Sequence, residues 1–424
     1  MTSFRPKKIG KAVFCNILEW QAHRLRKKHQ FTVVAIAGSV GKTSTKLAIA
    51  AALGSELRVI YQDGNYNDRL TVPLVLFGRV LPKLSNMAAW LKIFISNERQ
   101  LRKDYPYDVA VLELGTDGPG QIEKFAYLRP DLLVLTAIAP EHMEFFGTLE
   151  AVAREELAAL GFSKQALINI DDVPEQFLPS AFFLGYGRRP RADYSIQHRA
   201  ESTLNGQEVI FKLAGGREMK AYIRFLGEHG AKIILAAAAV ADLLKLPVEG
   251  IEQAVSNIKP FPGRMQILPG IDDSTIIDDT YNASPAAVKA ALDVLYHAEA
   301  AQRIAVLGSM NELGKSSPGS HREIGEYCDP EKLQTVVTIG QEAKKYLAPA
   351  AKRRGCEVVS FLDPYEAGTF VRTRIGPGSV VLFKGSQNGV FAEEAIKPVL
   401  ANPDDETRLV RQSTFWMRKK RHTR

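Results

Sequence analysis

Short apolar runs alternate with Ala-rich, helix-like stretches along most of the 424-residue chain. The β-branched runs at Val33–Ala37, Val109–Leu114 and Asp131–Ala137 have the nearly continuous apolar character of strands that are buried on both faces of a parallel sheet. Segments 44–53 and 227–246 between such runs are typical of helices. Because strands that alternate with helices favour parallel pairing through crossovers, the pattern predicts an α/β fold.

A second set of strand-like runs follows Pro260–Arg264, a segment whose Pro and Gly residues are typical of a domain boundary. Between the two sets, residues 180–225 alternate apolar and polar positions in short pieces and predict a β excursion. The later strand-like runs lie at 274–278, 303–307, 333–339, 357–361 and 380–383. We therefore predict a central parallel-sheet domain followed by a smaller, doubly wound domain.

Residues 8–30 place apolar side chains at helical spacing between basic ones and predict an amphipathic helix. We expect this helix to pack on the domain that follows it. A helix lying on a membrane surface is the alternative, because Trp20 is close to the apolar face and basic residues occupy another. Segment 81–107, which contains Trp90, predicts a further helix whose apolar residues pack in the core.

Composition is that of a globular protein, with 46% apolar and 24% charged residues. The formal net charge of +8 is concentrated between Lys7 and Lys28 and at Arg418–Arg421. We expect these ends to be solvated and partly disordered, and their charge leaves open a weak contact with a membrane surface. We expect no nucleic-acid partner, because no aromatic stacking pattern accompanies the basic residues.

The three cysteines, Cys15, Cys328 and Cys356, are far apart in the sequence and form no CxxC pair. A zinc ribbon or a disulfide framework is therefore not expected, and a reducing compartment fits better. No apolar run reaches the roughly 20 residues that a membrane span requires, and the first residues lack the pattern of a signal peptide. We expect a cytoplasmic protein.

The segment that follows strand 33–37 has the features of a phosphate-binding loop. Backbone N–H groups at a helix N-terminus can hold a phosphate, Lys42 can neutralise it, and the Thr43 hydroxyl can reach Mg²⁺. The general pattern also requires a glycine where Ile36 stands, so a chance strand–turn–helix is the alternative, but the flanking elements favour the phosphate site. The predicted nucleotide-binding residues here are Gly38, Ser39, Val40, Gly41, Lys42, Thr43 and Ser44.

Polar residues stand at the ends of the predicted strands, where parallel sheets collect their ligands. Glu113 ends one strand, and His142 follows another, so both can lie at the same sheet edge as Thr43. A hydroxyl, a carboxylate and an imidazole around a triphosphate form a plausible Mg²⁺ set. Each residue taken alone is a weak signal.

Several motifs occur together in one order, and through them the chain resembles the Mur ligase family, most closely its D-alanyl-D-alanine-adding branch. The resemblance covers about residues 31–400. The motifs are Gly38–Ser44, Gly64–Asn67 with Val72–Leu74, Leu112–Gly115, Thr136–His142, Asp278–Pro285, Val306–Gly314 and Lys384–Ser386. The family's own ATP loop also lacks the first glycine, which accounts for Ile36.

The resemblance implies a P-loop-containing central ATPase domain, a Rossmann-like C-terminal domain and an ATP-dependent amide ligase. In such an enzyme a carboxylate takes the γ-phosphate and an amine then attacks the acyl phosphate. The implied substrates are UDP-MurNAc-tripeptide and D-Ala-D-Ala, with ATP and Mg²⁺. By resemblance Thr43 and Glu113 hold one Mg²⁺ and His142 a second metal. Arg264, Asp279 and Asn282 contact the nucleotide.

The sequence departs from the family pattern at three points. Where the family places a carbamylated lysine we find Glu156, and we expect its carboxylate to hold the second metal directly; Glu155 and Lys164 remain alternatives. The segment Gly227–Lys232 lacks the family's Asn positions, which leaves base contacts there unassigned. Only about 30 residues precede the ATP loop, so we expect the N-terminal UDP-binding domain to be lacking.

We predict a basic N-terminal helix at 1–30, a central ATP-binding domain at 31–263, a C-terminal domain at 264–402 and a basic tail at 403–424. We also predict a monomer. A ligase acting on another carboxylate, such as a folate-polyglutamate or cell-wall amidating type, is an alternative. A catalytically silent nucleotide-binding module is another, but the retention of Lys42, Thr43, Glu113 and His142 argues against it.

Overall fold

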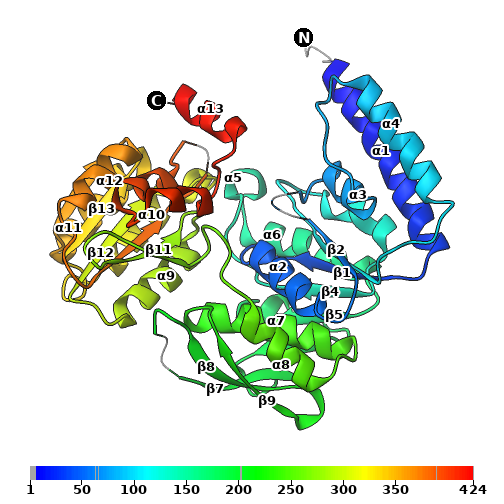
Figure 1. Ribbon diagram of the computed structural model, residues 1–424, viewed down its shortest axis with the longest axis horizontal. Helices are drawn as coiled ribbons and strands as arrows, with labels where there is room; N and C mark the ends of the chain where they lie inside the picture. The colour runs from blue at the N-terminus through cyan, green and yellow to red at the C-terminus, as the bar shows by residue number, and fades with distance from the viewer. Residues whose placement is uncertain (1–5, 63, 65, 201–202, 388, 424) are drawn as a thin grey trace.

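A computed structural model of the chain describes residues 6–62, 64, 66–200, 203–387 and 389–423, with side chains placed between residues 11 and 420 of these ranges. The chain forms two sheets, each with helices on both faces (Figure 1). Nine strands from residues 32–223 form the first sheet, and six strands from residues 266–384 form the second. The predicted α/β fold, a P-loop sheet followed by a smaller Rossmann-like sheet, is confirmed.

The first sheet has the strand order β2-β3-β1-β4-β5-β6-β7-β8-β9. Pairing is parallel from β2 to β7 and antiparallel from β7 to β9. The predicted β excursion therefore continues the main sheet and ends it with a hairpin. The strands are β1 (Thr32–Ala37), β2 (Val59–Tyr61), β3 (Val109–Glu113), β4 (Leu132–Leu135), β5 (Ala166–Asn169), β6 (Leu184–Gly187), β7 (Tyr194–Arg199), β8 (Gln207–Lys212) and β9 (Glu218–Ile223).

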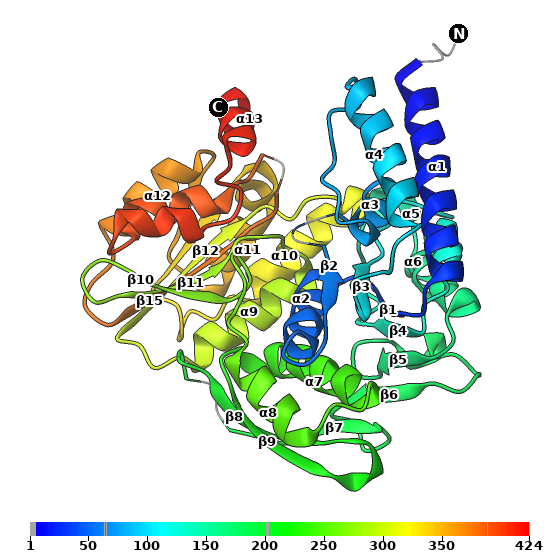
Figure 2. The ribbon, with the colours of Figure 1, turned by 45° about the vertical axis from the view of Figure 1, so that its right-hand side comes forward.

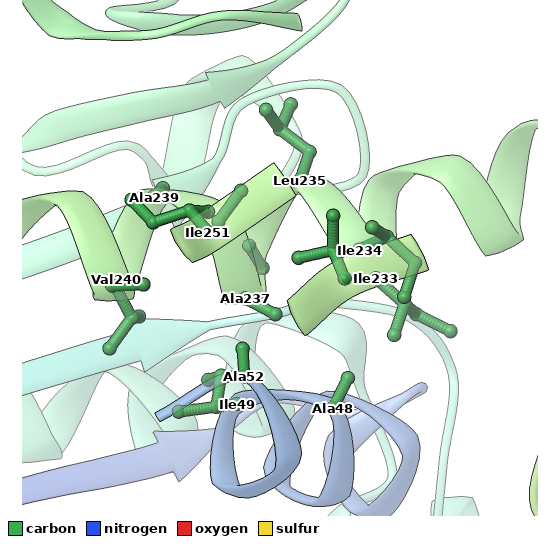
Figure 3. Close-up of a cluster of buried hydrophobic side chains, with 14 of the residues drawn as sticks. Ala48, Ile49, Ala52, Ile233, Ile234, Leu235, Ala237, Ala239, Val240 and Ile251 are labelled. Carbon is green, nitrogen blue, oxygen red and sulfur yellow. The ribbon is translucent and has the colours of Figure 1, made fainter. Parts of the chain in front are cut away.

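Helices cover both faces of the first sheet. They are α1 (Pro6–Lys28), α2 (Lys42–Leu53), α3 (Thr71–Leu76), α4 (Met87–Gln100), α5 (Met143–Phe146), α6 (Leu149–Leu157), α7 (Gly227–Leu243) and α8 (Val248–Asn257). Short 3-10 turns join them: η1 (Ile122–Leu128), η2 (Ala158–Phe162), η3 (Glu175–Phe177) and η4 (Ala214–Gly216). In Figure 3, Ala48, Ile49 and Ala52 of α2 face α7 in one buried cluster. Because these alanines are small, α2 can pack closely on α7 and fix the loop before it.

The second sheet has the order β10-β11-β15-β12-β13-β14, parallel throughout except between β10 and β11. Its strands are β10 (Gln266–Pro269), β11 (Thr275–Asp279), β12 (Gln302–Gly308), β13 (Thr335–Ile339), β14 (Val358–Phe361) and β15 (Ser379–Lys384). Its helices are α9 (Pro285–His297), α10 (Ser317–Tyr327), α11 (Ala348–Arg354), α12 (Pro364–Arg372) and α13 (Thr414–Thr423). Shorter turns are η5 (Gly314–Ser316), η7 (Ala392–Ala395), η8 (Lys397–Val399), η9 (Pro403–Arg408) and the π-helical η6 (Ala343–Leu347).

The predicted amphipathic helix at the start of the chain forms as α1 and packs alongside α4 (Figure 2). Phe14 stacks on the buried Trp90 with ring centroids 4.5 Å apart. The amide of Gln21 accepts a 3.0 Å hydrogen bond from Asn97, and Arg24 donates to Glu98 at 2.8 Å. The expectation of a packed helix, and of core packing at Trp90, is therefore confirmed, whereas Leu91 of the same predicted helix is exposed. No helix among the described residues is long and apolar enough to span a membrane.

The C-terminal tail is only in part the solvated end that its charge predicts: Arg418 and Lys419 are exposed, but two other basic residues of the tail are not. Arg411 and Lys420 are buried, because Glu393 and Glu394 of η7 supply two buried carboxylates beneath them. The guanidinium of Arg411 lies 2.6 Å from Glu393, and the Lys420 ammonium lies 2.8 Å from the same carboxylate. The tail is thus attached to η7 of the second domain by ion pairs between its basic residues and these two carboxylates.

We predict that acid weakens this attachment through Glu394. Burial would raise the pKa of Glu394, but hydrogen bonds from Lys420 and Tyr365 outweigh it and lower the pKa from 4.5 to about 2. Its contribution to the free energy of unfolding, on the order of 3 kcal/mol, is complete above pH 4.5 and is lost as pH falls towards 2. Denaturant titrations should show Glu394→Gln flattening this acid-side slope, whereas Glu366→Gln, at an exposed position of α12, should not. Equal slopes would contradict the prediction.

Candidate active site

A cavity of about 840 Å³ lies between the two sheets. On one side it is lined by the loop before α2, the end of β3 and the start of α7. On the other it is lined by the loop after β11, by α9 and by residues 311–313 of the second domain. Because β1 pairs with β3 and β4 in the middle of the parallel sheet, its loop meets their carboxyl ends at one edge.

Two glycines give the loop after β1 its shape. Gly38 has φ of 122°, and a Cβ there would lie 2.4 Å from the Thr136 hydroxyl and 2.9 Å from a backbone nitrogen. Gly41 has φ of 84°, and α2 begins at the next residue, Lys42. The first N–H groups of α2 therefore stand at the cavity, where an anion can accept their hydrogen bonds. Ile36 is a buried residue of β1, so the turn needs no glycine there.

Lys42 lies among acidic groups and a carbonyl. Its ammonium donates to the carbonyl of Gly38 and lies 3.2 Å from Glu141 and 3.9 Å from Glu156. Burial would lower the pKa of Lys42, but Glu141, Glu156 and Glu113 outweigh it and raise the pKa. Lys42 therefore carries a full positive charge at the mouth of the phosphate loop.

Glu113 is buried at the end of β3 and is held on several sides. It lies 3.3 Å from the Lys46 ammonium and accepts a 3.0 Å hydrogen bond from Asn67. Burial would raise the pKa of Glu113, but Lys46 and Lys42 outweigh it and keep the pKa below its usual value. Its Oε2 is the oxygen that faces the Lys46 ammonium, and the Thr43 hydroxyl lies within hydrogen-bonding reach of the carboxylate. An anionic oxygen and a hydroxyl at a phosphate loop are ligands that suit Mg²⁺.

His142 joins the two domains. Its Nδ1 lies 3.0 Å from Oε2 of Glu312, a residue of the second domain. Burial would lower the pKa of His142, but the hydrogen bond with Glu312 outweighs it and raises the pKa. Among the described residues no three His, Cys, Asp or Glu side chains converge in the geometry of a metal site. A second metal held by His142 and Glu156 stays a prediction.

Glu156 lies beneath the phosphate loop and does not line the cavity. Its carboxylate accepts a 2.6 Å hydrogen bond from the backbone N–H of Gly38 and faces Lys42. Burial raises the pKa of Glu156 to about 7, although Lys42 and the Gly38 N–H oppose the shift. These contacts are those of a residue that holds the loop and its lysine. Metal binding by Glu156 stays a prediction.

The two alternatives to Glu156 have other partners. Glu155 accepts backbone hydrogen bonds from the three residues Gly120, Gln121 and Ile122 at 2.6–2.7 Å. Lys164 lies on the surface and pairs with Asp131 at 2.6 Å. Neither side chain lines the cavity.

The second domain contributes the remaining predicted residues to the cavity wall. Arg264 stacks over Tyr281, with its guanidinium carbon 4.0 Å from the ring centroid. Asp279 pairs with the buried Lys384 at 2.8 Å, and the same ammonium donates to the carbonyl of Asn282 at 2.7 Å. The Lys-Gly-Ser turn therefore positions the loop that carries two predicted nucleotide contacts. All predicted site residues line the cavity except Gly38 and Glu156; their roles stay predictions.

Arg411 is a positioning residue that the sequence analysis missed. It donates to the carbonyls of Thr280 and Tyr281 at 2.7 Å and 2.9 Å, from 130 residues further along the chain. No motif surrounds it, and the only sequence signal is the basic character of the tail. His229 of α7 was missed as well; a Cβ on Gly41 would lie 3.5 Å from its ring, so it borders the phosphate loop.

We predict that Arg411→Ala weakens the site from a distance. The change leaves Glu393 buried beside Lys420 alone and releases the carbonyls of the loop that carries Asp279. Removing one partner of a buried pair costs about 3–5 kcal/mol of stability. We expect a lower melting temperature and a raised KM for the nucleotide, while Arg408→Ala in the exposed part of the tail changes neither. An unchanged melting temperature would contradict this role.

Comparisons with known protein families agree with this geometry. The Mur ligase middle domain matches residues 94–241, and the Mur ligase glutamate ligase domain matches residues 263–387. Together the two matches cover more than half of the chain. The chain belongs to the Mur ligase family.

Two curated Mur ligases similar to the chain carry the same name. The UDP-N-acetylmuramoyl-tripeptide–D-alanyl-D-alanine ligase of Bacillus subtilis is 29% identical over 379 residues, which are 88% of this chain and 76% of that protein. The Escherichia coli enzyme of the same name is 28% identical over 391 residues, 89% of this chain and 79% of that protein.

Solved Mur ligase structures share the fold. MurF from Acinetobacter baumannii has a TM-score of 0.74 at 22% identity and covers 91% of this chain and 81% of its own. MurF from Thermotoga maritima, solved in complex with ADP, has a TM-score of 0.72 at 23% identity. The match covers 92% of this chain and 84% of that one. These likenesses extend over both sheets of this Mur ligase.

Proposed function

We propose that this Mur ligase is an ATP-dependent amide ligase that activates a carboxylate as an acyl phosphate and joins it to an amine. One observation carries the proposal. A single cavity brings together the phosphate loop with Lys42 and Thr43, the carboxylate Glu113, and Arg264 and Asp279 of the second domain. A carboxylate is a poor electrophile at neutral pH because it has no good leaving group. A site built around a triphosphate can transfer a phosphoryl group to the carboxylate, and phosphate then becomes the leaving group.

The residues of the first domain bind and orient the triphosphate. The N–H groups at the start of α2 and the charged Lys42 hold the phosphate oxygens, and Lys42 stabilises the charge that develops on the transferred group. Thr43 and Glu113 would hold Mg²⁺, which screens the phosphate charges and polarises the group in transfer. His142 lines the same cavity, and Glu141 lies between it and Lys42, 3.8 Å from His142 and 3.2 Å from the Lys42 ammonium.

The second domain closes the site. His142 pairs with Glu312, and a Cβ on Gly314 would lie 2.9 Å from the backbone of Glu144, so the two domains touch directly here. Arg264 and Asp279 then face the phosphate loop across the cavity. We propose that ATP and the acyl substrate favour this closed arrangement and that opening releases the product.

We propose D-Ala-D-Ala as the amine and UDP-MurNAc-tripeptide as the carboxylate, in peptidoglycan precursor synthesis. The support is the shared name of the curated relatives, of which this chain spans about three quarters. A cytoplasmic location follows from the same proposal, because ATP and a UDP-linked precursor are its substrates. We also propose that the enzyme acts as a monomer, since the described cavity is complete within one chain.

Phosphate release from Mg·ATP tests this function. We expect release to require both UDP-MurNAc-tripeptide and D-Ala-D-Ala, and the product mass to equal that of the joined substrates. ATP binding without release would reject these substrates and direct the search to another carboxylate, such as a folate. Absence of ATP binding would reject the proposed activity itself.

A further inference from the structure

Basic charge is concentrated in one projecting part of the molecule. We call α1, α4 and the segment 79–86 that leads into α4 the helix pair. Residues 6–30 and 79–103 contain 13 Lys or Arg and two Glu, a net charge of +11, whereas the whole chain carries +8. The remainder of the chain is therefore net acidic, at −3. Figures 1 and 2 show α1 and α4 standing away from the body of the first domain.

Exposed apolar side chains gather on the same part. Of 15 large hydrophobic residues that are exposed among the described residues, eight belong to the helix pair. They are Val13, Trp20, Val80, Leu81, Leu84, Met87, Leu91 and Ile95. Val80, in the segment before α4, is 81% exposed, and Met87, at the start of α4, is 63% exposed. Neither side chain is needed for packing within the protein. Apolar residues that cluster on a surface mark an interaction site more often than scattered ones do.

The apolar and basic residues share the outer face of α4. Trp90 and Phe94 point towards Phe14 of α1, and they account for the inner face. The exposed residues of α4 and of its C-terminal extension to residue 103 recur at spacings of three and four; they are Met87, Ala88, Leu91, Lys92, Ile95, Arg99, Arg102 and Lys103. Leu91 and Ile95 thus lie between cationic side chains along one stripe.

The C-terminal helix α13 also exposes an aromatic and a basic side chain, and it projects in the same direction as the helix pair. Phe415 is 69% exposed, and Arg418 is exposed one turn later. Lys420, paired with Glu393 and Glu394, fixes α13 to the second domain, so the outward residues are held in place. Both views show α13 projecting in the same direction as the free ends of α1 and α4.

We propose that the helix pair and α13 dock this enzyme on an anionic lipid bilayer. Cations interleaved with exposed aliphatic and aromatic side chains fit an interface that offers negative headgroups above acyl chains. Nucleic acid would match the charge but not the aliphatic stripe of Met87, Leu91 and Ile95. The contact is peripheral, because none of the described helices can span a membrane.

Docking in this way would bring the cavity to the membrane surface. Leu81 belongs to the helix pair and also lines the cavity, beside Tyr66 and Thr71. The cavity wall at Leu81 therefore adjoins the docking face. The proposal does not depend on which carboxylate the enzyme uses, so binding and activity can be measured separately.

Vesicle flotation with the full-length protein tests the proposal. We expect binding to vesicles with 30% phosphatidylglycerol in phosphatidylcholine, little binding to pure phosphatidylcholine, and loss of binding as salt is raised. The triple variant Lys83→Glu/Lys92→Glu/Arg102→Glu should lower the partition coefficient at least about tenfold, since each surface cation contributes to attraction. The variant Met87→Ser/Leu91→Ser/Ile95→Ser should weaken binding while preserving its dependence on salt.

Matched variants on another surface control for charge and hydrophobicity. Lys212→Glu/Lys220→Glu lies on exposed positions of β8 and β9, and Phe182→Ser removes an apolar residue that is 83% exposed. We expect both to bind vesicles like the unchanged protein, with circular dichroism confirming that every variant is folded. Equal binding by the helix-pair variants, or no binding to anionic vesicles, would overturn the proposal. A salt-sensitive dimer without vesicle binding would assign the face to self-association and overturn it as well.

Discussion

Lys42→Ala should abolish ATP-dependent phosphate release, lowering kcat by at least about 10³-fold. The substitution removes the cation whose charge is secured by Glu141 and Glu156 and which stands at the N-terminus of α2. The next lysine of α2, Lys46, pairs with Glu113 instead. Initial rates of phosphate release at saturating substrates give the measurement.

Lys124→Ala provides the matched control, because it deletes an exposed lysine of η1 outside the cavity. We expect it to leave turnover unchanged. If Lys42→Ala turned over at the rate of the control, the assignment of the phosphate loop would be wrong. A folded variant that still binds nucleotide but releases no phosphate would instead separate the role of Lys42 in transfer from a role in binding.

Glu156→Gln should reduce kcat about 100-fold, and added bicarbonate should change neither the variant nor the unchanged enzyme. The glutamine can still accept the hydrogen bond from Gly38, but it removes a carboxylate that faces Lys42 at 3.9 Å. Lys42 then loses part of its electrostatic support and shifts towards Glu141. Phosphate release measured in CO₂-depleted and bicarbonate-supplemented buffer checks both statements.

Glu150→Gln lies on the exposed side of the same helix, α6, and should behave like the unchanged enzyme. An unimpaired Glu156→Gln variant would reject any catalytic need for this carboxylate. Stimulation of the unchanged enzyme by bicarbonate would show that a carbamate forms after all, and Glu156 would then not replace it.

The sequence predicts most of the fold because its signals are local. The runs that become β1, β3 and β4 are continuously apolar, as strands buried on both faces must be. The short edge strand β10 was missed, because it contains Pro269 and pairs antiparallel only with β11. The buried charges of the tail were also missed, since Arg411 and Lys420 have partners that no local pattern reveals.

The site shows the same division between local and long-range information. The phosphate loop could be found from Gly38–Ser44 together with the strand before it and the helix after it, since these elements are consecutive in sequence. Glu113 and His142 lie far apart in the sequence, and they could be placed at one site only by assuming that their strands are parallel neighbours. The pairing of β1 with β3 and β4 agrees with that assumption. The place of Glu156 under the loop depends on the contact between α6 and the loop after β1, which spacing along the chain does not encode.

The most direct test of the central claim follows oxygen from the acyl substrate. UDP-MurNAc-tripeptide labelled with ¹⁸O in its reacting carboxylate is incubated with Mg·ATP, D-Ala-D-Ala and the enzyme, and the released phosphate is analysed by mass spectrometry. An acyl phosphate transfers one labelled oxygen to each phosphate as the amide forms. We predict one ¹⁸O per phosphate and a ligated product of the joined mass. Release of unlabelled phosphate would show that ATP is hydrolysed by water and would contradict the ligase mechanism.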